Sequence, residues 1–211
     1  MRIDILDYIQ KWYFSYCNGD WEHTFGVTIT TVQYNWDVNI SLIETKLEDI
    51  SYQPQTINFY HNENDFLKCY LRSALHYKSK EPFNAEFKAN GSANSLIEIL
   101  NKFYEWTNEI ENISVIEGDN QELVWLQQWL SQTPEINDRI YINTLDNPGW
   151  EIFINLKNSS LLEKIFNEIE IERTDDDWIH SRIRNSKLQM FGGPLNLKEM
   201  IRNFREWVSE I

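Results

Sequence analysis

Two short stretches of the chain bring acidic groups and a histidine close together in sequence. In the first, Asp20–His23, Trp21 separates Asp20 from Glu22, and His23 follows. A carboxylate beside a histidine can perform acid–base catalysis. Neighbouring side chains on a strand point to opposite faces, however, so this spacing alone does not make the groups converge. We therefore expect Asp20–His23 to serve structure or recognition, with Asp20 and Trp21 at the lip of a strand as an interface anchor.

The second stretch is the run Asp175–Asp177, followed by Trp178 and His180. Hard cations require several oxygen ligands around one point, and three consecutive carboxylates rarely provide that arrangement. We expect a solvated acidic turn whose charges can form the rim of a protein interface, and no metal site.

The rest of the chain offers no further catalytic set. The histidines are scattered at His23, His61, His76 and His180, and no nucleophile elbow, phosphate-binding glycine loop or dinucleotide fingerprint is present. The two cysteines lack the paired spacing of zinc or redox motifs. The sequence therefore predicts neither an enzyme nor a cofactor.

The chain also repeats itself. Leu96–Ile110 matches Leu197–Ile211, and Ile9–Trp12 matches Leu126–Trp129. This order of matches predicts a tandem duplication, with a first module over residues 1–113 and a second over 119–211. Between them lies a short acidic joint that we expect to be solvated. Further matches are Thr31 with Thr144, Trp36 with Trp150, Asp65–Leu67 with Asp177–Ile179, and Leu71 and Arg72 with Ile183 and Arg184.

Each module has the pattern of a helix, several strands and a closing helix. Apolar residues first recur at helical spacing and then alternate with polar ones, as in strands with one buried face. We predict an α+β fold of two tandem modules, each with an antiparallel β-meander of about four strands between its helices. Asn147–Gly149 favours a type II turn, and Ser95 and Asn196 favour capping boxes with Glu98 and Glu199.

Nine tryptophans are many for a chain of 211 residues. We expect most of them to pack in the core and between the modules. Trp21 and Trp178 stand beside acidic residues and are the best candidates for partial exposure.

Six stretches of the two modules carry a family resemblance. They are Trp12–Gly26, Trp125–Trp129, Thr144–Trp150, Glu170–Arg173, Asp176–His180 and Phe191–Pro194. The Asp-Asn-Pro-Gly-Trp stretch occurs only in the second module, and the Asp-Trp-Glu-His stretch only in the first. Together these stretches resemble the immunity protein 53 family of bacterial polymorphic toxin systems. The resemblance implies a protein that binds and neutralises a cognate toxin without catalysis.

The chain is strongly acidic, with 33 acidic and 19 basic residues and a formal net charge of −14. Acidic surfaces repel nucleic acid and attract basic proteins, so we expect a basic partner, for example a nuclease toxin occluded by this chain. The expected partner-binding residues are Asp20, Trp21, Glu22, His23, Asp146, Asn147, Trp150, Asp175, Asp176, Asp177, Trp178 and His180.

Two other functions remain open on the sequence alone. A carbohydrate-binding or carbohydrate-hydrolysing protein would place exposed tryptophans around a pair of carboxylates in a groove. A self-associating scaffold would present a large apolar patch outside the modules. No apolar run reaches the length of a membrane span and the acidic N-terminus is unlike a signal peptide, so we expect a cytoplasmic protein of undetermined oligomeric state.

Overall fold

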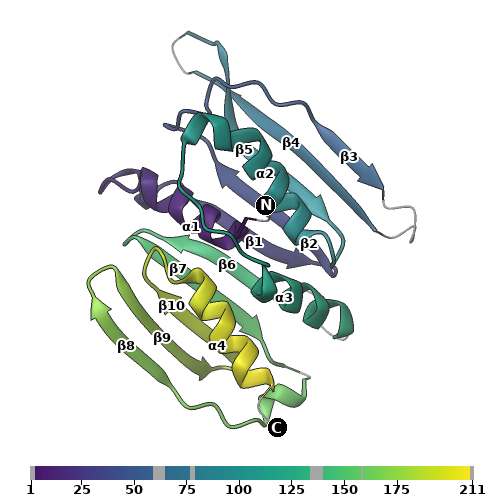
Figure 1. Cartoon of the computed structure of the whole chain (residues 1–211), viewed down its shortest axis with the longest axis vertical. Coiled ribbons are helices and arrows are strands. Elements are labelled where there is room, and N and C mark those ends of the chain that lie inside the picture. The colour runs from purple at the N-terminus through teal and green to yellow at the C-terminus, as the bar shows by residue number, and fades with distance from the viewer. Residues whose placement is uncertain (1–2, 59–64, 77–78, 134–139, 158, 210–211) are drawn as a thin grey trace.

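The computed structural model describes residues 3–58, 65–76, 79–133, 140–157 and 159–209 (Figure 1). The elements of the first half are α1 (Ile5–Tyr16), the 3-10 helix η1 (Trp21–His23), β1 (Val27–Val32), β2 (Asn35–Ser41), β3 (Gln55–Asn58), β4 (Phe66–Leu75), β5 (Pro82–Gly91) and α2 (Leu96–Glu111). Those of the second are α3 (Gln121–Gln132), β6 (Ile140–Leu145), β7 (Gly149–Asn155), the 3-10 helix η2 (Ser160–Leu162), β8 (Ile169–Thr174), β9 (Asp177–Arg184), β10 (Lys187–Gly192) and α4 (Leu197–Ser209).

All ten strands of the described chain form one antiparallel sheet in the order β3-β4-β5-β2-β1-β6-β7-β10-β9-β8. The predicted α+β class, with two helix–strand–helix halves, is confirmed. Each half has five described strands, and its last strand returns to lie beside its second. The halves share a single sheet because the middle residues of β1 and β6 pair, from Thr28 opposite Asn143 to Thr30 opposite Tyr141.

The β1–β6 seam has the local symmetry of a dimer within one chain. Thr31 Oγ1 accepts a hydrogen bond from the Ile140 N–H at 3.0 Å, and Thr144 Oγ1 accepts one from the Val27 N–H at 3.1 Å. The match between Thr31 and Thr144 in sequence therefore has a structural cause. Each threonine holds the first strand of the other half where the regular ladder ends.

The helices of the described chain cover one face of the sheet (Figure 1). Their contacts cross between the halves. Gln10 on α1 accepts a hydrogen bond from the Lys198 N–H of α4 at 3.4 Å, and the matching Gln127 on α3 accepts one from the Ile97 N–H of α2 at 2.7 Å. Each half thus supplies an acceptor to the N-terminus of the other half's closing helix, where backbone donors lack partners within the helix.

Matched tryptophans fix each closing helix to the sheet. The Trp36 indole donates to the Ala93 carbonyl at 2.8 Å, and the Trp150 indole donates to the Pro194 carbonyl at 2.9 Å. Both side chains are fully buried. The strand registers place Trp36 opposite Gly91 and Trp150 opposite Gly192, so the two halves use the same packing between equivalent strands.

Three local predictions were wrong. Leu145 pairs with Gly149, so three residues, Asp146–Pro148, connect β6 to β7, and Gly149 begins a strand without the left-handed φ of a type II turn. A Cβ at Gly149 would lie 2.4 Å from the Gly192 carbonyl oxygen, so close strand approach accounts for this glycine. The Ser95 side chain makes no cap bond to its helix.

The Asn196 side chain, predicted as the second cap, accepts from the Trp178 N–H and donates to Asp177 instead. The joint between residues 113 and 119 is largely exposed, but Glu111, the last residue of α2, is buried. The Glu111 carboxylate accepts from the Tyr16 hydroxyl at 2.7 Å and lies 3.6 Å from the Lys46 ammonium.

Candidate functional site

The sheet face opposite the helices has no described element packed on it, and we call it the open face. Along β2 the side chains alternate between buried ones on the helix side and half-buried ones on the open face. A row of paired residues crosses the open face from one half to the other through the seam. In order, its members are Tyr70, Lys88, Asn39, Thr28, Asn143, Glu151, Phe191, His180 and Glu170.

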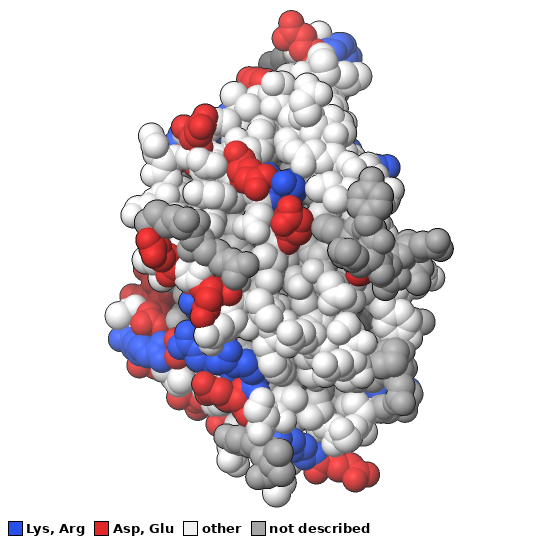
Figure 2. All heavy atoms as spheres, turned by 45° about the vertical axis from the view of Figure 1, so that its right-hand side comes forward, with Lys and Arg blue, Asp and Glu red and all other residues white. Residues whose placement is uncertain are grey.

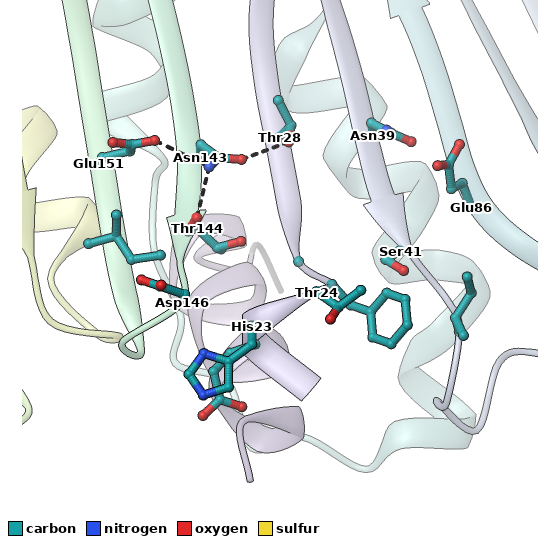
Figure 3. A pocket seen from close by; sticks show the side chains of 15 residues that line it. His23, Thr24, Thr28, Asn39, Ser41, Glu86, Asn143, Thr144, Asp146 and Glu151 are labelled. Carbon is teal, nitrogen blue, oxygen red and sulfur yellow. Dashed lines mark hydrogen bonds between the residues drawn. The ribbon is translucent and has the colours of Figure 1, made fainter. Parts of the chain in front are cut away.

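A hollow of about 570 Å³ lies over the end of the β1–β6 seam. Figure 3 shows Glu151 and Glu86 on opposite sides of it, with Asn143, Thr28 and Asn39 between them. His23 and Asp146 lie at one end. The lining residues include four carboxylates (Glu22, Glu86, Asp146 and Glu151) and no Lys or Arg.

Asn143 organises the floor of the hollow. Its Oδ1 accepts from the Thr28 hydroxyl at 2.8 Å, and its Nδ2 donates to the Thr144 carbonyl at 2.8 Å and to Glu151 Oε1 at 3.2 Å (Figure 3). Burial raises the pKa of Glu151, and the hydrogen bond from Asn143 only partly offsets that effect. Among the described residues no cation forms an ion pair with Glu151.

The charge of Glu86, on the other side of the hollow, is compensated by the guanidinium of Arg72. The two carboxylate oxygens of Glu86 accept from Arg72 Nε at 2.5 Å and Arg72 Nη2 at 2.6 Å. These hydrogen bonds hold the pKa of Glu86 below its usual value. The two sides of the hollow therefore differ in net charge, because Glu86 binds a guanidinium and Glu151 does not.

Trp21–His23 forms the 3-10 helix η1, which Asp20 precedes, and not a strand. The expectation that these neighbouring side chains point to opposite faces of a strand was therefore wrong. Glu22 turns back to accept from the Asn18 N–H at 2.9 Å and the Gly19 N–H at 2.8 Å. Burial acts to raise the pKa of Glu22, but these backbone donors outweigh it and hold that pKa below its ordinary value. Asp20 and His23 are exposed.

The predicted exposure of Trp21 was also wrong. Trp21 is 1% exposed and its indole donates to the Ile43 carbonyl at 2.8 Å. It packs among Trp12, Tyr13 and Tyr16 of α1, with ring centroids 5.6 to 6.3 Å away. Trp21 therefore anchors η1 to the core, and Trp150 does the same for β7.

The second predicted stretch forms a corner at the outer edge of the sheet. Asp175 and Asp176 make the exposed turn between β8 and β9. Asp177 accepts from the Asn196 amide at 2.9 Å and the Arg173 guanidinium at 2.8 Å, and these bonds lower its pKa. Trp178 is half-buried, as predicted.

His180 lies close to the same corner, on the open face. Its ring is 5.2 Å from that of Trp178, and its Nε2 lies 2.5 Å from Glu172 Oε1. The structure therefore gathers the predicted residues into two groups, one at the hollow (Glu22, His23 and Asp146) and one at this corner, with Asn147 exposed on the loop beside the hollow.

The sequence analysis missed an aromatic row on the open face of the second half, formed by Tyr141, Phe153 and Phe191. The rings of Tyr141 and Phe153 stack with centroids 6.0 Å apart, and those of Phe153 and Phe191 meet edge to face at 5.7 Å. Tyr141 is 36% exposed. The available signal was alternation, since all three rings lie in β6, β7 and β10 at positions that alternate with the buried, mostly apolar ones.

Other kinds of site receive no support in the described residues. No three His, Cys, Asp or Glu side chains among them are grouped as metal ligands. Burial raises the pKa of Cys69 to about 11, so this thiol is protonated at neutral pH. No helix in the described part of the chain is long and apolar enough to cross a membrane. His61 lies outside the described residues.

Charged side chains are unevenly spread over the surface. In the view of Figure 2, acidic and basic groups lie next to one another on one side, and a broad area carries neither. On the helix side, Lys198 pairs with Asp4, and Arg202 lies 3.3 Å from Glu122. Basic groups there are used to pair internal acids.

A model of the family described as immunity protein 53 matches residues 6–108 and again residues 123–209. The chain belongs to the immunity protein 53 family. The two matched segments confirm both the resemblance and the duplication, and each begins in an opening helix and ends in a closing one. Comparisons with curated proteins and with solved structures give no match.

Proposed function

We propose that this member of the immunity protein 53 family neutralises a cognate bacterial protein toxin by binding it in a stoichiometric complex. The family match over both halves carries this proposal. The action would be occlusion, with the immunity protein covering the toxin surface that meets its target, and no turnover. We place the binding surface on the open face, where the hollow and the β8–β9 corner expose acidic and aromatic groups.

Co-expression tests the proposal directly. The toxic domain encoded next to this gene is expressed in a bacterial host with and without the immunity protein. Growth should be restored only with it, and the purified proteins should form a complex of fixed ratio. Continued toxicity with abundant folded immunity protein would contradict the proposal.

A basic toxin, such as a nuclease, is the partner that the net charge of −14 favours. Electrostatic steering makes association rates fall steeply as salt screens the charges. Stopped-flow association measured from low to high salt should show this fall. A rate independent of salt would remove the basic partner from the account while leaving neutralisation intact.

No observation favours the carbohydrate or scaffold alternatives to the same degree. The residues that line the hollow include carboxylates but no tryptophan. Among the residues that the structure describes, the most exposed large apolar side chain is Ile165, at 84%, and it lies in the segment that precedes β8 rather than in a broad patch on the open face.

A further inference from the structure

We propose that Glu151 and the adjoining aromatic row form a socket for an arginine side chain presented by the protein partner. The inference rests on the proposed function and names the chemistry of its binding surface. It draws on three observations, which are the charge of Glu151, the position of the aromatic rings and the absence of a helix over this face in the described chain.

Glu151 carries a charge that the described chain does not neutralise. It is half-buried in the hollow, and its carboxylate accepts one hydrogen bond from a neutral amide, that of Asn143. Two other carboxylates that line the hollow are bound more fully, Glu86 by a guanidinium and Glu22 by two backbone donors. A desolvated carboxylate without a cation is stabilised when a cation reaches it.

The aromatic row begins beside this carboxylate. Phe191 lies directly opposite Glu151 in the β7–β10 register, and Tyr141 lies two residues from Asn143 along β6. Glu151 also contributes to raising the pKa of Tyr141, after the larger effect of burial. A planar guanidinium can bind the carboxylate through two N–H groups and stack on neighbouring rings, whereas an ammonium group has no such fork. The site therefore favours arginine over lysine.

The position on the sheet allows a protein segment to reach the socket. Because the four α-helices of the described chain lie on the other face and η1 only borders the hollow, the hollow and the aromatic row are open to a partner (Figure 1). Aromatic and arginine residues are enriched at the energetic centres of protein interfaces, which agrees with this pairing. A competing cation of the chain itself is Arg182, which lies opposite Gln189 in the β9–β10 register and donates from its Nε to the Gln189 side chain at 3.3 Å.

The test is titration calorimetry of the purified immunity protein with the toxic domain encoded next to its gene. Glu151→Gln keeps the shape and removes the charge, so the dissociation constant should rise by at least about 30-fold, as when one member of a desolvated ion pair is lost. Glu109→Gln, on the exposed side of α2, is the matched control and should change it less than about threefold. Thermal unfolding of both variants checks that the fold is kept.

A second measurement identifies the partner group. Each arginine of the toxic domain is changed to alanine and combined with Glu151→Gln, and one arginine should show a coupling of about tenfold or more. Unchanged binding by Glu151→Gln, or a large loss on Arg182→Gln with none on Glu151→Gln, would overturn the socket and leave the proposed function standing. Failure of the unaltered protein to bind would overturn both.

Discussion

The two halves of the molecule agree on the helix side of the sheet and differ on the open face. On the helix side Trp36 and Trp150 make equivalent indole bonds, and Thr31 and Thr144 make equivalent bonds across the seam. On the open face the strand registers place Asn39 and Asn90 of the first half where the second has Phe153 and Phe191. Packing thus constrains one side, and the other has diverged between copies of one fold.

This difference indicates which half provides most of a binding surface. The aromatic row lies on a sheet face that no described element covers, so part of its apolar surface is exposed to water. Exposed apolar surface of this kind is typical of interaction sites rather than of surfaces with a purely structural role. The first half has polar groups at the equivalent positions and contributes η1 and Glu86 to the rim of the hollow. We therefore expect binding to be asymmetric although the fold is nearly symmetric.

The largest effect on stability should come from removing the buried tryptophans that the two halves share. Trp36→Ala and Trp150→Ala each remove a fully buried indole and its hydrogen bond, and each should lower the free energy of unfolding by about 3–5 kcal/mol. Chemical denaturation of the two variants measures this. A loss in one variant more than twice that in the other would show that the equivalent positions are not energetically equivalent.

The next effect sharpens the difference on the open face. Phe153→Ala combined with Phe191→Ala should weaken binding to the toxic domain by about 30-fold or more, since central aromatic residues are common hot spots. The control is Asn90→Ala in the first half, at the position equivalent to Phe191, and it should weaken binding by less than about threefold. An equal loss for the control and for Phe191→Ala alone, measured by calorimetry on folded proteins, would contradict an asymmetric surface.

A smaller effect should appear at the seam. Thr31→Val removes the acceptor for the Ile140 N–H in a site that is 2% exposed, so it should cost about 1–3 kcal/mol. Thr144→Val removes the matching acceptor where Thr144 is half-buried and lines the hollow, so we expect water to replace the lost hydroxyl. Thr144→Val should therefore lower the free energy of unfolding clearly less than Thr31→Val does. Urea unfolding of both variants gives the two values, and a larger loss for Thr144→Val would be the contrary result.

The smallest expected effect is a pH dependence of opposite sign at two carboxylates. The pKa of Glu22 is lowered on folding, so its stabilising contribution is present above its unfolded pKa and is lost as the pH falls. The pKa of Glu151 is raised, so ionisation makes a destabilising contribution that disappears as the pH falls. One pKa unit is worth about 1.4 kcal/mol, which sets the scale.

Glutamine variants separate these two contributions. At pH 7 Glu22→Gln should be less stable than the unaltered protein, and Glu151→Gln should be equally stable or more so. Both differences should shrink at a pH below the carboxyl pKa values. Unfolding free energies at the two pH values decide the matter, and a destabilising Glu151→Gln at pH 7 would contradict a desolvated carboxylate without a cation.

Much of the fold was predictable because local patterns and packing agree. The periodicity of Ile5, Ile9 and Trp12 and the alternation of Val27, Ile29 and Thr31 gave the element types, and matched spacing gave the duplication. The single sheet was not predictable in this way, because pairing of β1 with β6 depends on contacts over more than a hundred residues. No local signal distinguishes such a seam from an exposed strand edge.

The candidate site was predictable only in part. Glu22, His23 and Asp146 all line the hollow, but Trp21 and Trp150, which were also expected to bind the partner, are buried. The acidic neighbours of Trp21 in the sequence did not determine the exposure of its ring. The aromatic row was missed since each of its rings belongs to a different strand. Glu151 was missed because it is distinguished by the lack of a paired cation among the described residues. Only the three-dimensional contacts reveal such a lack.

The exchange of helix acceptors between the halves has a consequence for synthesis of the chain. The N-terminus of α2 receives its acceptor from Gln127, which a ribosome adds some thirty residues later, and the N-terminus of α4 receives its acceptor from Gln10, made near the start. The closing helix of the first copy therefore lacks this acceptor until Gln127 has been synthesised. We expect α2 to gain the contact only in the second part of translation, and a fragment released before Gln127 would lack it.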